Sequence, residues 1–138
     1  MASFVEAVCG ATKTALAADA TLLGYLGAAT QIRRAFQRGE TEPPCVIMEP
    51  GDEEPPVEAA DELRTCELTL HCYATNDLTA ATIRDRVIAL LNHNISLTAT
   101  GYKIDMSFVR RASRPFWSDQ EQAFRCEVWI ALNMKSTG

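Results

Sequence analysis

The sequence predicts a single α+β domain in which helices pack on one face of a mostly antiparallel four-stranded sheet that ends in a long β-hairpin. The prediction depends on two kinds of segment. In some, apolar residues recur at helical spacing, which predicts helices; in others, apolar and polar residues alternate or all residues are apolar, which predicts strands. The expected order is helix, short helix, strand, strand, helix, strand, strand. With 138 residues, 47% of them hydrophobic, the chain can bury its own core, so residues 1–138 are interpreted as one domain.

The first helix is predicted to begin at Ser3, because Ser3 and Glu6 have the spacing of a capping box. The residues behind them recur every three or four positions and should form one buried stripe: Val5, Val8, Cys9, Thr12 and Leu16. This pattern is typical of a helix that packs one side against a core and leaves the other in solvent.

A short second helix and a short strand are expected next. Asp19 is placed to cap the helix, and Gly24 or Gly27 should end it. The region from Gly27 to Pro44 has no sustained period and is interpreted as a loop with at most a short strand. Residues 45–49 are a compact apolar run bounded by prolines, which predicts a strand.

An acidic, proline-rich segment occupies residues 49–62. It contains seven acidic residues and no basic residue, and five of the six prolines of the chain lie between residues 43 and 56. Such a composition buries too little apolar surface to order itself, so we predict a flexible loop. Its carboxylates are candidates for contact with a basic partner surface, and they include Asp52, Glu53 and Glu54.

A strand and a helix are predicted after this segment. From Leu63 to Ala74 the residues alternate between two faces. One face carries Cys66, Leu68, Leu70 and Cys72, and the other carries Glu67, Thr69, His71 and Tyr73. Asn76 or Asp77 can cap the helix, whose apolar positions have helical spacing. These positions are Ala80, Ile83, Val87, Leu90 and Leu91.

Two long strands close the chain and form the predicted hairpin. The second has six apolar residues in succession at a spacing of two: Phe124, Cys126, Val128, Ile130, Leu132 and Met134. On the first strand Ile104, Met106 and Phe108 are expected to share the core face. Beyond them the core positions are taken by Arg110, Ala112 and Arg114. The hairpin should therefore extend past the core, with its arginines in solvent or on a partner.

The residues that could carry chemistry show no catalytic or metal-binding pattern. The five cysteines include no C-x-x-C pair and follow no secretion signal, which indicates reduced thiols in a chain made in the cytoplasm. His71 is expected at the surface, on the strand face opposite Cys66 and Cys72, so these side chains cannot converge on a metal or form a Cys–His pair. We therefore expect no catalytic residue, no cofactor, no metal and no membrane span.

Two groups of arginines are candidates for a protein interface: Arg33, Arg34 and Arg38, then Arg110, Arg111 and Arg114. The second group lies beside Phe116 and Trp117, and arginine and tryptophan are enriched where proteins meet. An interface is favoured over plain solvated surface, and nucleic acid is least favoured because the net charge is −5. Trp129 lies opposite the apolar row of the last strand, where either the N-terminal helix or a neighbouring subunit would cover it.

Several stretches resemble the tail-terminator or tail-completion proteins of long-tailed bacteriophages and related gene-transfer particles. They are ALAADATLLGYLG, PPCVIMEP, ELTLHCYATNDLTAATIRDRVIALLN, YKIDMSFVRRASRPFW and FRCEVWIALNM. The resemblance covers nearly the whole chain and consists of apolar and turn patterns in a shared order of elements. It includes no catalytic motif, and segment 49–62 is longer and more acidic than is usual in that family.

The resemblance implies a structural virion protein that is made in the host bacterial cytoplasm. Such subunits form a hexameric ring at the head-proximal end of the tail tube. There the ring stops tube polymerisation and presents a surface to head-completion or neck proteins. The implied partners are further copies of the chain, the tail-tube protein and those neck proteins, and DNA meets the ring only as it passes through the lumen. No cofactor is implied.

Other functions remain open at this point. The chain could be a neck or head-completion subunit, a small ligand-binding or enzymatic α+β domain, or an RNA-binding sheet that stacks bases on Tyr73 and Trp129. Ligand binding requires a pocket with convergent polar groups, and RNA binding conflicts with the negative net charge. A closed ring needs two complementary patches on each subunit, and the acidic segment and the basic hairpin are a candidate pair.

Overall fold

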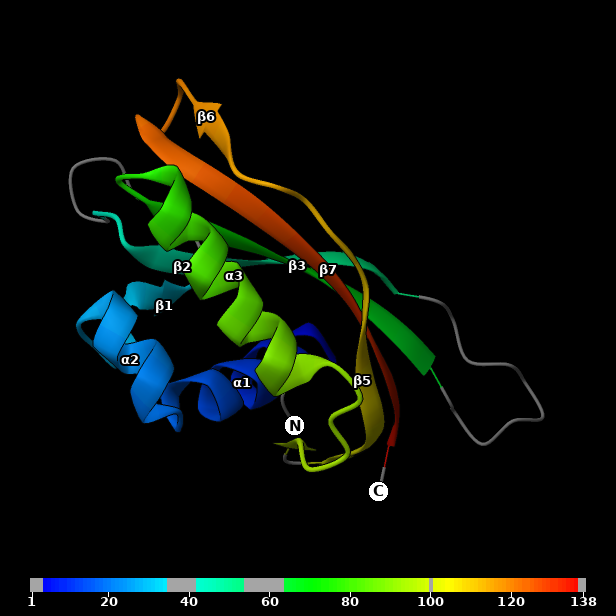
Figure 1. Cartoon of the computed structure of the whole chain (residues 1–138). Helices are drawn as coiled ribbons and strands as arrows, with labels where there is room; N and C mark the ends of the chain where they lie inside the picture. Colours follow the sequence, from blue (N-terminus) through cyan, green and yellow to red (C-terminus); the bar gives the residue numbers. More distant parts are fainter. Residues whose placement is uncertain (1–3, 35–41, 54–63, 100, 137–138) are drawn as a thin grey trace.

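The computed structural model describes residues 4–34, 42–53, 64–99 and 101–136 of the chain (Figure 1). Within these ranges three α-helices lie on one face of a curved sheet: α1 (Phe4–Ala17), α2 (Ala20–Leu26) and α3 (Asp77–Leu91). A short 3-10 helix, Ala29–Gln31, follows α2. The combination of helices and sheet, with the helices on one side, is as the sequence predicts. None of the described helices is long and apolar enough to cross a membrane.

Within the same ranges the sheet has seven strands: β1 (Ile32–Arg33), β2 (Cys45–Glu53), β3 (Arg64–Ala74), β4 (Thr98–Ala99), β5 (Tyr102–Ala112), β6 (Phe116–Ser118) and β7 (Ala123–Ser136). Their order is β1-β2-β3-β7-β5-β4, and β6 pairs with β7. The predicted number of four strands is wrong, because the sheet is larger; it is mostly antiparallel as predicted but mixed, since β1 runs parallel to β2. The predicted strands form its antiparallel centre, whereas β1, β4 and β6 have only two or three residues, too few to show alternation.

The hydrophobic core lies between the helices and one face of the sheet. The predicted apolar faces of the two central strands are buried there: Cys66, Leu68, Leu70 and Cys72 on β3, and Cys126, Val128, Ile130, Leu132 and Met134 on β7. The helices contribute Val8, Cys9, Thr12 and Leu16 from α1 and Ala80, Ile83, Val87 and Leu91 from α3. The spacing of apolar residues thus identified the core-facing side of these four elements correctly.

The ends of α2 and α3 follow the predicted capping residues. The carboxylate of Asp19 accepts a hydrogen bond from the backbone N–H of Leu22 at 2.9 Å. The helix ends at Gly27, whose φ of 93° lies in the left-handed region that favours glycine. At α3 the side-chain oxygen of Asn76 accepts from the first turn at 2.8 Å. The expected cap of α1 at Ser3 lies outside the described residues.

β2 continues into the acidic segment, so the prediction of a flexible loop is wrong for residues 49–53. Backbone pairing with β3 keeps this stretch in the sheet despite its composition. Gly51 permits the close approach of the two strands, because a Cβ at this position would lie 3.2 Å from the Cβ of Glu67. The remainder of the predicted loop, residues 54–62, lies outside the described part of the chain.

Irregularities in β5 change which of its side chains face the core. Ile104 is buried as predicted, but the register with β7 shifts before Met106, so that Ser107 is buried and Phe108 lies on the opposite face. The hydroxyl of Ser107 donates a hydrogen bond to the carbonyl oxygen of Leu91 at 2.6 Å, which satisfies the C-terminal end of α3. The predicted core positions of Met106 and Phe108 are therefore wrong, because one extra residue reverses an alternating pattern.

Asp19 also ties α2 to α3. Two nitrogens of the Arg86 guanidinium, Nε and Nη2, donate to its carboxylate oxygens at 2.8 and 2.6 Å. These hydrogen bonds are the largest of the influences that lower the pKa of Asp19 from 3.8 to about 2, and the bond from Leu22 acts in the same direction. A carboxylate with a lowered pKa stabilises the fold above its unfolded pKa and ceases to do so as it becomes protonated.

We expect Asp19→Asn to lower the melting temperature near neutral pH, and we expect the difference from wild type to shrink as the pH falls from about 4 towards 2. Thermal melting of both proteins across this range measures the effect. Asp85→Asn is the matched control, because the Asp85 side chain is 67% exposed and its ion pair with Arg84 should contribute little. A difference between wild type and Asp19→Asn that stays constant down to pH 2 would contradict the assignment.

Candidate functional site

The helix-free face of the sheet carries polar and aromatic side chains from its two central strands. On β3 these are Glu67, Thr69, His71 and Tyr73, and on β7 they are Arg125, Glu127 and Trp129. All of these side chains alternate with the core residues of the same strands. No described helix covers this face, so it is a surface on which a partner could bind.

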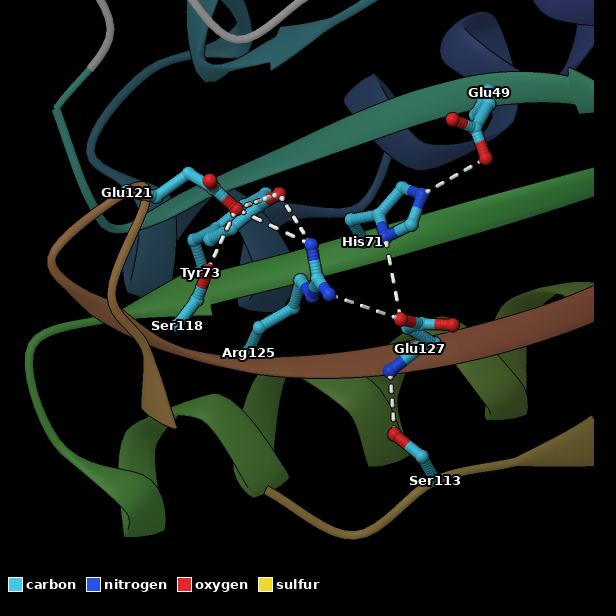
Figure 2. A network of polar contacts seen from close by, with 8 residues as sticks. All are labelled: Glu49, His71, Tyr73, Ser113, Ser118, Glu121, Arg125 and Glu127. Atoms are coloured by element: carbon cyan, nitrogen blue, oxygen red, sulfur yellow. Dashed lines mark hydrogen bonds and ion pairs between the residues drawn. The ribbon is translucent and has the colours of Figure 1, made fainter. Parts of the chain in front are cut away.

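A hydrogen-bonded network closes the end of this face next to β6 (Figure 2). At its centre is Glu121, whose side chain is only 8% exposed. One carboxylate oxygen accepts from Tyr73 Oη and Ser118 Oγ, both at 2.9 Å, and from Arg125 Nη1 at 3.2 Å. Burial above all raises the pKa of Tyr73 to about 12, so its hydroxyl stays protonated and donates to Glu121. The network pins the turn between β6 and β7 onto β3.

The same turn covers a small second cluster of buried residues. Cys45, Ile47, Tyr73 and Ala123 are all nearly inaccessible although they belong to the face without helices. Arg125 also packs on β6 at this end of the face. The central carbon of its guanidinium lies 4.8 Å from the centre of the Phe116 ring, a cation–π contact. This end of the face is therefore closed by the chain itself, and its polar groups serve the fold.

His71 lies between two carboxylates, and the prediction of a surface histidine is wrong. Its side chain is 12% exposed, with Nε2 at 3.4 Å from Glu49 Oε1 and Nδ1 at 3.9 Å from Glu127 Oε1. Glu127 is in turn 3.4 Å from Arg125 Nη2. Strand pairing causes the burial, since neighbouring strands place long side chains on both sides of the imidazole ring (Figure 2). The two carboxylates approach opposite nitrogens of the imidazole ring.

The cysteines lie in the interior, as the sequence predicts. Burial raises the pKa of Cys9 and Cys126, raises that of Cys45 to about 12, and raises that of Cys72 still further. Since the thiolate is the reactive form, these thiols are poor nucleophiles at neutral pH. Among the described residues no group of three or more His, Cys, Asp or Glu side chains could hold a metal ion.

The open part of the helix-free face contains a shallow hollow of about 280 Å³. Its lining includes Gly51, Glu67, Thr69, Arg110, Arg111 and Trp129. Arg110 forms an ion pair with Glu67, and the guanidinium carbon of Arg111 lies 4.1 Å from the centre of the Trp129 ring. The alternative in which the N-terminal helix covers Trp129 is wrong, because α1 packs on the other face of the sheet.

The remaining predicted site residues are spread over the surface. Arg114 is exposed, and Trp117 is 47% exposed with its ring edge-on to Phe124. Arg33 is half-buried and donates to the carbonyl oxygen of Thr30 at 2.8 Å. Arg34 lines a separate hollow beside α1. The two arginine groups thus lie at different edges of the sheet.

Of the acidic candidates Asp52, Glu53 and Glu54, only the first two lie among the described residues. Asp52 and Glu53 belong to β2, and Glu54 lies outside the described residues, as does Arg38. The sequence reasoning missed Glu121 and the burial of His71. The available signal was the presence of opposite charges and of the aromatic residues Tyr73 and Trp129 on the outward faces of the neighbouring strands β3 and β7.

No protein-family model matches the chain, and no curated protein matches its sequence. Its fold is similar to that of a chain in the solved structure of the virion of a native gene transfer agent (GTA) particle, with a TM-score of 0.82. The similarity covers 99% of this chain and 100% of that chain, at 16% sequence identity. At this identity the comparison shows a common fold that extends over the full length of both chains.

Proposed function

We propose that this chain is a structural protein of a phage-like particle. In this proposal it is a subunit of a ring at the head-proximal end of the tail tube, where the ring ends tube polymerisation and provides the surface for joining the head. The observation that carries the proposal is the similarity of fold, over 99% of the chain, to a component of a GTA virion particle. The stretches that resemble tail-terminator proteins favour this position within the particle.

The surface of the domain supports an assembly role. One face of the sheet is free of described helices, and it carries exposed arginines together with Trp129. Such residues are enriched at protein interfaces. Among the described residues, the buried thiols and the polar contacts around His71 and Arg125 stabilise the domain and form no convergent set of reactive groups. The proposal accordingly includes no catalysis, no cofactor and no metal.

Light scattering over a concentration series, with and without the tail-tube protein, tests the proposal. We expect a ring of about 91 kDa, six copies of a 15.2-kDa chain, either alone or once the tube protein is added. An unrelated acidic protein in place of the tube protein is the control. A chain that remains monomeric with tube protein at every concentration would overturn the proposal. Binding only to portal-side proteins would move the chain to the neck of the particle.

A further inference from the structure

Arginines of the hairpin differ in how their charge is satisfied. Arg110 pairs with Glu67, and Arg125 pairs with Glu121 and Glu127. Arg111 and Arg114 are exposed, and within the described part of the chain neither has a carboxylate partner. A guanidinium group has five N–H donors in a planar fork that matches a carboxylate, so these two side chains can still bind acidic groups.

The acidic residues of the chain are concentrated in one place. Seven of the 18 acidic residues lie in residues 49–62, where there is no basic residue. The rest of the chain therefore carries 13 basic residues against 11 acidic ones, and the net charge of −5 comes entirely from this segment. Each subunit thus has a strongly acidic segment and, on the hairpin, two basic groups that have no carboxylate partner among the described residues.

The hollow beside Arg111 has the chemistry of a docking site for an acidic segment. Trp129 provides an apolar floor, and Arg111 lies over its ring with its outer edge in solvent. At one side of the hollow Gly51 has no side chain, which allows β2 to lie close to Glu67 of β3. Tryptophan and arginine are among the residues enriched at the centres of binding interfaces.

We propose that this hollow, where Arg111 is the unpaired basic group, binds the acidic segment 49–62 of a second copy of the chain through the part that follows β2, and that Arg114, three residues further along the chain, adds a second positive charge. The inference deepens the proposed function and rests on the ring, because head-to-tail contacts that close by rotation join two different patches of identical subunits. The acidic segment and the hollow are two such patches of opposite charge. Individual exposed pairs contribute little, so the contact depends on several charges acting together around Trp129.

A charge-swap experiment tests this contact between copies. Arg111→Glu with Arg114→Glu is expected to abolish ring formation, and so is Glu54→Lys with Glu58→Lys. An equimolar mixture of the two double variants should form rings again, because each reversed patch meets a reversed partner. Lys103→Glu is the matched control, since Lys103 is exposed on β5 outside the hollow and the change in charge is the same per residue. Thermal melting checks that every variant is folded.

The outcomes separate the contact from the ring itself. Rings formed by Arg111→Glu/Arg114→Glu alone would overturn the contact and leave the proposed function standing. A mixture that fails to recover rings would indicate that the segment binds within its own chain, which also overturns the contact. If the wild-type chain forms no ring under any condition, the proposed function fails.

In that case a labelled peptide of residues 49–62 tests the hollow. Binding at least about tenfold weaker to Arg111→Glu/Arg114→Glu supports the inference, and equal binding refutes it.

Discussion

Leu70→Ala is expected to lower the free energy of unfolding by about 3 kcal/mol and the melting temperature by about 10 °C. Leu70 is fully buried on the core face of β3, between Met48 of β2 and Val128 of β7. Removing its isobutyl group leaves a cavity that the paired backbones of three strands cannot close, because their hydrogen bonds hold them at a fixed separation. Urea unfolding followed by circular dichroism measures the loss.

The neighbouring residue on the same strand provides the control. Thr69 points to the helix-free face, where it is only half-buried, so Thr69→Ala should change the free energy of unfolding by less than about 1 kcal/mol. A similar loss for the two variants would show that the core does not lie on the face assigned here. The comparison therefore tests the orientation of β3 as well as the contribution of one side chain.

Glu121→Ala is expected to lower the free energy of unfolding by about 2 kcal/mol. The substitution leaves Tyr73, Ser118 and Arg125 without the carboxylate oxygen that accepts hydrogen bonds from all three. These donors are largely buried beneath the turn between β6 and β7, where water can replace the missing acceptor only if the turn opens. Chemical denaturation gives the stability, and faster amide hydrogen exchange near residues 118–123 would report the opening.

Gln120→Ala serves as the control for this turn, because Gln120 is adjacent and exposed. It should leave the stability within about 0.5 kcal/mol of wild type. Tyr73→Phe removes a single donor from Glu121 and should cost less than Glu121→Ala, about 1 kcal/mol. If Glu121→Ala were as stable as Gln120→Ala, the network would be a surface feature that contributes little to the fold.

The elements of this domain that depend on local pattern could be predicted from the sequence. The stripe of α1, the cap at Asp19 and the alternating rows of β3 and β7 are confirmed. In each case the signal lies within one element, because burial of one side imposes a period on the residues and a helix end needs a particular side chain or a glycine. The expectation of exposed arginines on the hairpin is also confirmed for Arg110, Arg111 and Arg114.

Only the tertiary structure decided the features that depend on residues far apart in the chain. The shift before Met106 is set by pairing with β7, and the strand at residues 49–53 is held by β3 against its own composition. His71 is partly covered by carboxylates 22 and 56 positions away, and Glu121 accepts a hydrogen bond from Tyr73 across 48 positions. No periodicity within a segment reports such pairings. Local chemistry therefore determined the elements and their core faces, and the register between strands determined which polar groups meet and which remain open to a partner.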